Sequence, residues 1–317
     1  MILIISNEFD QSTHEVLEWL AQTNENIVVL NEFNSIKQIK LVITSSNNEE
    51  CCFHTTSGET FKISDIEFLW YRRGPIFIEK GLNAINQDQI DRSFRADWSI
   101  FTDFIFAMLS ERHYLGNPTI SEVNKFNVLL HATRCGLKIP STLLTNQKEC
   151  IIEQFGHAEV VSKPFNGRQL HSKTNILFEY TTKINLRNCA DSFNLSFIQE
   201  LVQKKYELRI FFLKGIFYSS AIFSQNNDKT KIDFRKYDFA KPNRVVPFIL
   251  PTKIENQLKL LMEVLHLDTG SIDMLVTTNN EYVFLEVNPV GQFGMVSKPC
   301  NYYLENKISK ILMQKAI

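Results

Sequence analysis

The feature that most constrains the fold is the segment 271–289, whose sequence is SIDMLVTTNNEYVFLEVNP. Two runs rich in β-branched and aromatic residues flank the pair Asn279-Asn280. Asn tolerates the positive φ that a two-residue hairpin turn demands. We therefore expect a β-hairpin with these two asparagines in its turn.

This turn also fixes which residues of the hairpin face each other. Side chains alternate along a strand, so every second residue shares one face of the hairpin. The expected cross-strand pairs on that face are Thr277 with Tyr282, Leu275 with Phe284, Asp273 with Glu286, and Ser271 with Asn288. Directly opposed residues have Cβ atoms roughly 4.5–5.5 Å apart.

The pair Asp273 and Glu286 points to a metal site. Two carboxylates this close repel, and a hard divalent cation resolves the conflict. Mg²⁺ prefers oxygen ligands and is typically held by one or two carboxylates together with substrate phosphates. Asn288 adds a third oxygen ligand on the same face. The alternative is an exposed hairpin whose polar face meets water.

Composition narrows the class of protein. The chain has 317 residues, 44% of them hydrophobic and 22% charged, which is typical of a soluble globular protein with two or three small domains. A net charge of −1 predicts no general attraction to nucleic acid or to an anionic membrane. The six cysteines are scattered without a CxxC, which fits a reducing, cytoplasmic compartment. We expect neither a signal peptide nor a transmembrane helix.

Hydrophobic periodicity gives the order of the elements. Alternating strands and helices up to residue 118 predict a small N-terminal α/β domain. A central domain over 119–198 and a C-terminal domain over 199–317 are expected to follow. The expected strands are 1–6, 27–30, 39–44, 59–63, 66–71, 158–163, 197–202, 207–213 and 216–223, with another beginning at 139. The expected helices are 10–21, 84–112, 121–136 with Ser121 as its cap, 253–265 and 298–316.

Phosphate binding would have to depend on charged side chains in this chain. Neither a P-loop nor a GxGxxG motif occurs. Lys163 is the best phosphate partner, because it ends an apolar strand and precedes Pro164 and a polar loop. It could equally be a solvated lysine at a sheet edge.

Further polar residues cluster in two places. Glu200 and Glu207 bracket a short linker and could hold a nucleotide, with Glu207 accepting hydrogen bonds from ribose hydroxyls. Arg209 shares a strand face with Glu207 and suits a phosphate, although the two could form a plain surface ion pair. Arg235 follows Asp233 in a polar stretch and could bind a carboxylate or phosphate through paired donors, or be an ordinary loop arginine.

The run Trp70-Tyr71-Arg72-Arg73 places two arginines at the end of an aromatic strand. They could bind an anionic substrate or a neighbouring subunit, or simply end the strand.

Taken in order, these segments resemble the ATP-grasp superfamily over roughly residues 1–310. Lys125 lies in a segment that resembles the helix bearing the first ATP-binding lysine, and Lys163 matches the second lysine. The resemblance implies an α/β ATP-grasp fold, with an N-terminal α/β domain followed by two α+β subdomains that hold ATP between them. The implied ligands of Mg²⁺ are Asp273, Glu286 and Asn288, and the implied nucleotide hinge is Gln199, Glu200, Leu201 and Val202, with Glu207 at the ribose. The loop after Lys163 has a single glycine, Gly167, where many members are glycine-rich.

Four segments are most similar to the graspetide maturases, the microviridin-type and grasp-with-spasm ligases: 70–73, 204–209, 233–235 and 286–293. This resemblance implies an ATP-dependent ligase that activates Asp or Glu side chains of a ribosomal precursor peptide as acyl phosphates. Hydroxyl or amine side chains then close ester or amide macrocycles. It also implies catalytic roles for Arg209 and Arg235, and a homodimer. The alternatives are a RimK-like ligase that adds amino acids to a small molecule or a protein terminus, and a catalytically silent protein that binds ATP and peptide.

Overall fold

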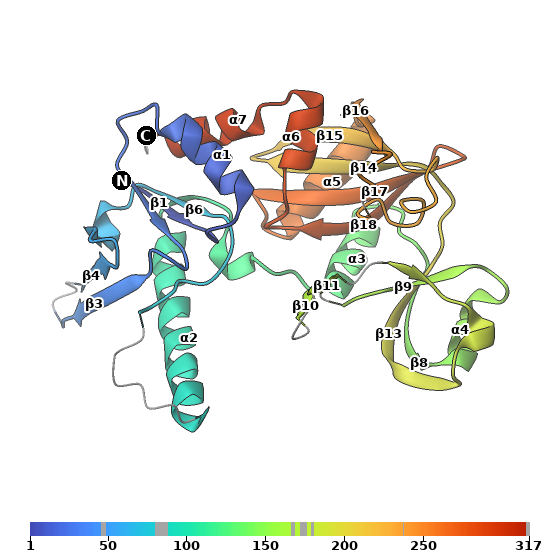
Figure 1. Ribbon diagram of the computed structural model, residues 1–317, viewed down its shortest axis with the longest axis horizontal. Helices are drawn as coiled ribbons and strands as arrows, with labels where there is room; N and C mark the ends of the chain where they lie inside the picture. Colours follow the sequence, from blue (N-terminus) through green and yellow to red (C-terminus); the bar gives the residue numbers. More distant parts are fainter. Residues whose placement is uncertain are drawn as a thin grey trace. The chain divides into compact units, whose positions relative to one another are not determined.

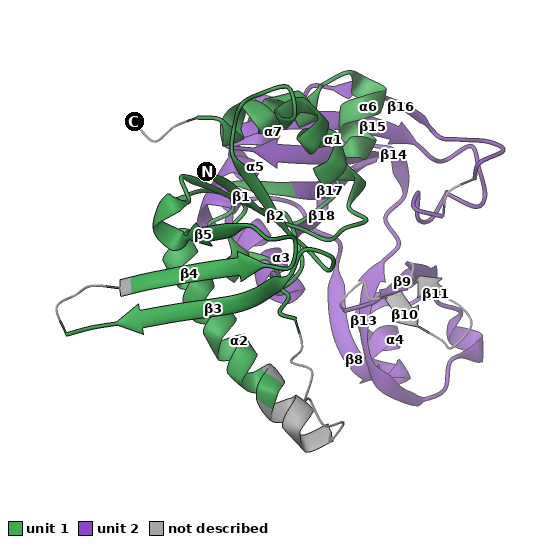
Figure 2. Cartoon of the chain, turned by 60° about the vertical axis from the view of Figure 1, so that its left-hand side comes forward, with its two compact units in different colours: residues 1–122, 266–270, 289–317 green, residues 123–265, 271–288 purple. Residues whose placement is uncertain are grey.

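The computed structural model describes residues 1–45, 49–79, 88–165, 169–171, 176–178, 181–236 and 238–314 (Figure 1). It divides into two compact units (Figure 2). Unit 1 contains residues 1–122, 266–270 and 289–317, and unit 2 contains residues 123–265 and 271–288. No helix among the described residues has the length and apolar character needed to cross a membrane.

Unit 1 is built on a parallel sheet in the order β2-β1-β6-β7. All residues of β1 (Ile2–Ile5) and β6 (Phe68–Tyr71) are buried, as expected for the central strands of a parallel sheet covered on both faces. The outer strands are β2 (Ile27–Leu30) and β7 (His113–Leu115). The helices of this unit are α1 (Gln11–Leu20), α2 (Asp88–Ser110), α6 (Gly294–Cys300) and α7 (Leu304–Leu312).

A small antiparallel sheet in the order β3-β4-β5 extends unit 1. Its strands are β3 (Ile36–Ile43), β4 (Glu49–Thr55) and β5 (Thr60–Lys62). Phe53 of β4 stacks on Phe61 of β5 with ring centroids 5.2 Å apart, and both pack into the same core as β1 and β6. The small sheet therefore shares its hydrophobic core with the parallel sheet.

A buried charge cluster links three segments of unit 1. Asp10 caps α1 by accepting a hydrogen bond from the Thr13 N–H at 3.0 Å, and its carboxylate also pairs with Arg72 and Arg73 at 3.3 and 2.8 Å. Both guanidinium groups donate to the carbonyl oxygen of Val290. Burial and the neighbouring Arg73 lower the pKa of Arg72 to about 9. Within this unit the two arginines therefore act as a structural clamp.

Unit 2 contains a first antiparallel sheet in the order β12-β9-β13-β8. Helix α4 (Lys148–Phe155) packs on it through Ile151, which shares a small core with Val160 and Ile198. The strands are β8 (Thr142–Gln147), β9 (Val160–Lys163), β12 (Thr182–Lys183) and β13 (Ser192–Glu200). A separate hairpin pairs β10 (Gln169–His171) with β11 (Ile176–Phe178).

The second sheet of unit 2 has the order β16-β15-β14-β17-β18. Its strands are β14 (Lys204–Leu213), β15 (Ile216–Phe223), β16 (Arg244–Phe248), β17 (Thr269–Thr277) and β18 (Tyr282–Asn288). Helices α3 (Lys125–Arg134) and α5 (Thr252–Val264) contact each other, and α3 also packs against β18. This sheet contains the hairpin that the sequence predicts.

The register of the hairpin corrects part of that prediction. The turn has three residues, because Thr277 is paired with Glu281 and only Asn280 has a positive φ, of 61°. Near the turn, Leu275 therefore faces Val283 and Val276 faces Tyr282, so the predicted Leu275–Phe284 and Thr277–Tyr282 pairs are wrong. A β-bulge at Leu285 then restores the predicted register, and Asp273 faces Glu286 and Ser271 faces Asn288.

Two predicted helices also differ from the structure. Helix α3 begins at Lys125 and is capped by Asn124, whose side chain accepts from the Phe126 and Asn127 N–H groups, so Ser121 is not its cap. The predicted closing helix 298–316 is interrupted, because Asn301 and Tyr303 adopt positive φ between α6 and α7. Helix α4 was not expected from the sequence.

We predict that Asp10→Ala destabilises unit 1 by about 3 kcal/mol, because it removes a helix cap and leaves the buried guanidinium of Arg72 and the partly buried one of Arg73 without their counter-charge. All three tryptophans of the chain, Trp19, Trp70 and Trp98, belong to unit 1. Tryptophan fluorescence during urea unfolding therefore reports on this unit. Glu18→Ala, at an exposed position of α1, is the control, and equal midpoints for the two variants would contradict the prediction.

Candidate functional site

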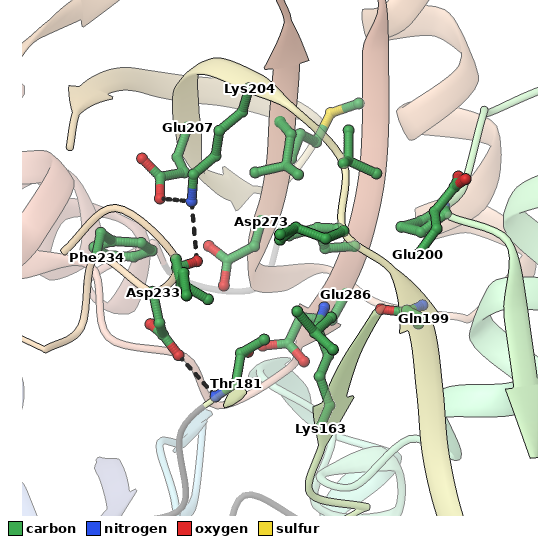
Figure 3. Close-up of a pocket in the computed structure, with 18 of the residues that line it drawn as sticks. Lys163, Thr181, Gln199, Glu200, Lys204, Glu207, Asp233, Phe234, Asp273 and Glu286 are labelled. Atoms are coloured by element: carbon green, nitrogen blue, oxygen red, sulfur yellow. Dashed lines mark hydrogen bonds and ion pairs between the residues drawn. The ribbon is translucent and has the colours of Figure 1, made fainter. Parts of the chain in front are cut away.

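A cavity of about 440 Å³ lies within unit 2, which is in the usual range for small-molecule sites. Residues of both sheets of unit 2 line it (Figure 3). The predicted site residues that line it are Lys125, Lys163, Gln199, Glu200, Leu201, Val202, Glu207, Arg235, Asp273 and Glu286. The fold thus brings together residues that are up to 161 positions apart in the sequence, from 125 to 286.

Two predicted residues lie outside this lining. Arg209 acts through a lining residue, because its Nη1 atom lies 2.7 Å from both carboxylate oxygens of Asp273. Asn288 is the exposed last residue of β18, opposite Ser271. The polar loop with Gly167 falls partly on residues 166–168, which lie outside the described residues.

The two hairpin carboxylates are surrounded by cations. Glu286 pairs with Lys125 at 3.3 Å, and Lys125 also donates to the Pro164 carbonyl at the end of β9. Burial raises the pKa of Glu286, but the charges of Lys125, Lys163 and Arg235 outweigh it and lower the pKa. Glu286 therefore stays ionised at neutral pH, as a metal ligand must.

Lys163 is a basic residue of this cluster for which the structure shows no ion pair. Its neighbours make ion pairs, Lys125 with Glu286 and Arg209 with Asp273, whereas no ion pair within 4 Å joins Lys163 to any described residue. Burial lowers the pKa of Lys163, the charge of Glu286 opposes this, and Lys125 and Arg235 lower it further. A partly buried cation without an ion-pair partner within 4 Å is favourable for binding an anionic ligand.

Gln199, near the end of β13, has a side-chain oxygen that accepts no hydrogen bond from the described residues. Thr142 donates its hydroxyl proton to the Pro140 carbonyl at 2.8 Å, so its oxygen accepts from Gln199 Nε2 at 2.9 Å. This arrangement fixes the orientation of the Gln199 amide. Its Oε1 atom is buried and has no hydrogen-bond partner among the described residues. An unsatisfied buried acceptor beside a cavity fits a ligand that supplies an N–H donor.

The carboxylate of Glu200 accepts a hydrogen bond from the backbone of the protein itself. Its Oε1 atom accepts from the Ser141 N–H at 3.0 Å, while the Leu201 N–H donates to the Glu159 carbonyl at 2.8 Å. These bonds hold the segment that follows β13 in place along the cavity wall. Glu200 thus positions the hinge.

Glu207 is buried at the opposite end of the cavity. Lys204 donates to its Oε1 atom and Ser224 to its Oε2 atom, both at 2.5 Å. Burial raises the pKa of Glu207, and the adjacent Lys204 opposes that rise. The Lys204–Glu207 pair was missed from the sequence, because strict strand alternation puts residues three apart on opposite faces.

Asp233 orients Arg235. Its carboxylate accepts from Arg235 Nε at 2.9 Å and Nη2 at 2.6 Å, and also from the Thr181 N–H at 3.2 Å. The bond from Arg235 is the main reason that the pKa of this guanidinium is raised. Arg235 is thus permanently charged and directed by a carboxylate, while its side chain remains 42% exposed.

The two carboxylates fit a magnesium ion that is also coordinated by the phosphates of a ligand. Among the described residues, no three carboxylate, thiol or imidazole side chains lie close enough to hold a metal by themselves. Asp273 and Glu286 are two carboxylates in register, and Mg²⁺ commonly uses one or two carboxylates together with substrate phosphates. The surplus positive charge of Lys163 suits those phosphates.

Comparison with solved structures identifies the fold. The Chryseobacterium gregarium RiPP-associated ATP-grasp ligase, solved with ADP and a leader and core peptide, is 25% identical with a TM-score of 0.79, covering 98% of this chain and 94% of that chain. The macrocyclase MdnC from Microcystis aeruginosa, bound with precursor peptide MdnA, is 23% identical with a TM-score of 0.76 and 98% coverage of both chains. D-alanyl-alanine synthetase A from Vibrio cholerae is 14% identical with a TM-score of 0.56, covering 98% of this chain and 96% of that chain.

No protein-family model and no curated protein matches the chain. The structural matches nevertheless extend over nearly the whole chain. The chain has the ATP-grasp fold, and the resemblance to the ATP-grasp peptide ligases that the sequence indicated is confirmed.

We predict that the cavity binds inorganic tripolyphosphate and that Lys163→Met weakens this binding about ten-fold, the effect of losing one charge-assisted hydrogen bond. Titration calorimetry at low and high salt measures it, with weaker binding expected at high salt. Lys138→Met is the control, because Lys138 is half-exposed and pairs with Glu281. Equal affinities for wild type and Lys163→Met would contradict the prediction.

Proposed function

We propose that the chain is an ATP-dependent ligase that activates Asp or Glu side chains of a ribosomal precursor peptide and joins them to hydroxyl or amine side chains of the same peptide. One observation carries this proposal: the facing carboxylates Asp273 and Glu286 lie in a cavity with Lys125, Lys163 and Arg235. Such an arrangement suits the triphosphate of a magnesium nucleotide. The full-length similarity to peptide ligases of this fold supports the substrate class.

The cavity offers a partner for each part of ATP. The unpaired Oε1 atom of Gln199 suits the adenine amino group, and the backbone of Leu201 and Val202 would border the base. Glu207 would accept hydrogen bonds from the ribose hydroxyls. Lys125 and Lys163 would bind the phosphates, since an ammonium group is a compact charge that suits phosphate oxygens.

The proposed reaction has two steps. A peptide carboxylate attacks the γ-phosphorus of ATP, the bond to the β-phosphate oxygen breaks, and ADP leaves. A hydroxyl or amine of the peptide then attacks the carbonyl carbon of the acyl phosphate, loses its proton, and displaces inorganic phosphate. Both steps develop negative charge on phosphate oxygens, which fixed cations stabilise. Arg235, held by Asp233, and Arg209, held by Asp273, would supply that charge.

Asp273 and Glu286 would hold Mg²⁺ with phosphate oxygens, and Asn288 remains a predicted third ligand. Bound there, the ion would neutralise phosphate charge and help align the triphosphate. Two structures of one protein of this fold, the ATP-grasp ligase PsnB, contain magnesium and ADP, which supports the same cofactors here. The precursor-peptide partner follows the leader and core peptides in the neighbouring structures, while a homodimer and a cytoplasmic location stay predictions.

A ligase that adds free amino acids is the second candidate, because the D-alanyl-alanine synthetase of Vibrio cholerae shares the fold. The mass of the product separates the two. Each side-chain link removes one water from the precursor, whereas addition of an amino acid increases the mass. A protein that binds ATP and peptide without turnover would give neither change.

We predict that Glu286→Gln abolishes ligation, because a neutral amide is a poor metal ligand and leaves three neighbouring cations without their carboxylate. The measurement is mass spectrometry of a precursor peptide after incubation with ATP and Mg²⁺, together with phosphate release. Suitable precursors are short peptides rich in Thr, Ser, Lys, Asp and Glu.

Glu281→Gln is the matched control, since Glu281 lies on the same hairpin but is exposed outside the cavity. The control should ligate at the wild-type rate. Normal turnover by Glu286→Gln would show that the assignment of this carboxylate is wrong.

A further inference from the structure

We propose that Lys204 is a positioning residue for Glu207, and that selectivity for a ribose carrying both hydroxyl groups depends on it. This inference rests on the proposed nucleotide function of the cavity. The geometry that supports it lies at one end of that cavity, at the beginning of β14 (Figure 3).

Lys204 makes two contacts inside the cavity wall. Its Nζ atom lies 2.5 Å from Glu207 Oε1 and 3.0 Å from the carbonyl oxygen of Ile232. The side chains of Lys204 and Glu207 are only 8% and 5% exposed. A buried pair with short hydrogen bonds holds both groups in one geometry, unlike a solvated surface pair.

Glu207 keeps free acceptor capacity in this arrangement. One oxygen accepts from Lys204 and the other from Ser224, which is completely buried. Each carboxylate oxygen can accept two hydrogen bonds, so each retains one position for a ligand hydroxyl. Only the ionised carboxylate is purely an acceptor. Burial raises the pKa of Glu207, and the adjacent ammonium limits that rise. Lys204 thus orients Glu207 and favours its ionised form, the one that accepts from both hydroxyls of a vicinal diol.

The second contact of Lys204 connects this end of the cavity to the loop that carries Arg235. Ile232 directly precedes Asp233, which orients Arg235. The ammonium therefore joins the first residue of β14 to the segment 232–235 through one backbone carbonyl. Loss of Lys204 should consequently affect both the ribose end and this loop.

The neighbouring residue Lys205 provides an internal comparison. Its side chain is exposed, and its Nζ atom donates to Oδ1 of Asn280, in the turn between β17 and β18, at 3.3 Å. The two lysines are adjacent in sequence but only Lys204 lines the cavity. Replacing either lysine by a neutral residue changes the net charge of the protein equally. Any difference between the two variants therefore comes from where the lysine lies.

The experiment measures dissociation constants of ATP, 2′-deoxy-ATP and 3′-deoxy-ATP by titration calorimetry with Mg²⁺ and without peptide. Wild type should bind ATP about ten-fold more tightly than either deoxy analogue, the effect of one hydrogen bond to a charged group. In Lys204→Met the affinity for ATP should fall, and the ratio between ATP and the analogues should approach one. Lys205→Met should keep both the affinity and the ratio of wild type.

Two further variants separate positioning from folding. Glu207→Gln should lose discrimination as Lys204→Met does, and the double variant should show no further loss in the ratio. If Lys204→Met lacks the native circular dichroism spectrum, Lys204→Gln replaces it, because it removes the charge with a smaller loss of polarity. A purely structural role would weaken binding of all three nucleotides equally and leave their ratio unchanged.

The outcomes distinguish this inference from the proposed function. Wild type that binds no ATP would overturn the proposed function. Wild type that binds ATP but does not discriminate against the deoxy analogues would overturn the present inference alone. A folded Lys204→Met variant that keeps the wild-type preference for ATP over the deoxy analogues would also overturn the present inference alone.

Discussion

The arrangement of the site depends on the opposition of Asp273 and Glu286 across one hairpin. Two carboxylates in direct register are unfavourable unless positive charge lies between or around them. In this fold Arg209 contacts Asp273, and Lys125 contacts Glu286, while Lys163 and Arg235 add to the positive field. Helix α3 and strands β9 and β14 must all be placed correctly to supply these side chains. The two facing carboxylates of the hairpin thus require basic side chains from the neighbouring elements.

Five of the six acidic side chains that line the cavity have a basic partner, and the sixth, Glu200, accepts from the Ser141 N–H. Lys204 holds Glu207, Arg235 is held by Asp233, and Lys183 pairs with Glu159 at the rim. Fixed pairs of this kind keep catalytic and binding groups in place before a ligand arrives, which lowers the cost of ordering them on binding. Lys163 has no ion pair within 4 Å among the described residues, so an anion bound beside it would be favourable.

The sequence predicted which residues meet at the site better than it predicted the backbone geometry there. Asp273 and Glu286 were correctly paired, although the turn was one residue longer than expected, because a bulge at Leu285 compensated for the shift. Pattern rules cannot foresee two irregularities that cancel. Lys204 escaped prediction because it occupies the first position of β14, where strand alternation does not hold strictly. Asn124 displaced Ser121 as the cap of α3 because the segment before it forms a separate short turn that ends at Ser121.

The internal ion pairs also indicate which contacts the proposed nucleotide would replace. Arg209 contacts both oxygens of Asp273, which are the same atoms that the proposed metal ion would require. Lys125 likewise occupies one oxygen of Glu286. A triphosphate with its cation offers each member of these pairs a new partner of opposite charge, so the number of ion pairs does not fall on binding. The cost of desolvating the charges has already been met in the folded protein. The buried charges thus stabilise one another until the ligand takes over their contacts.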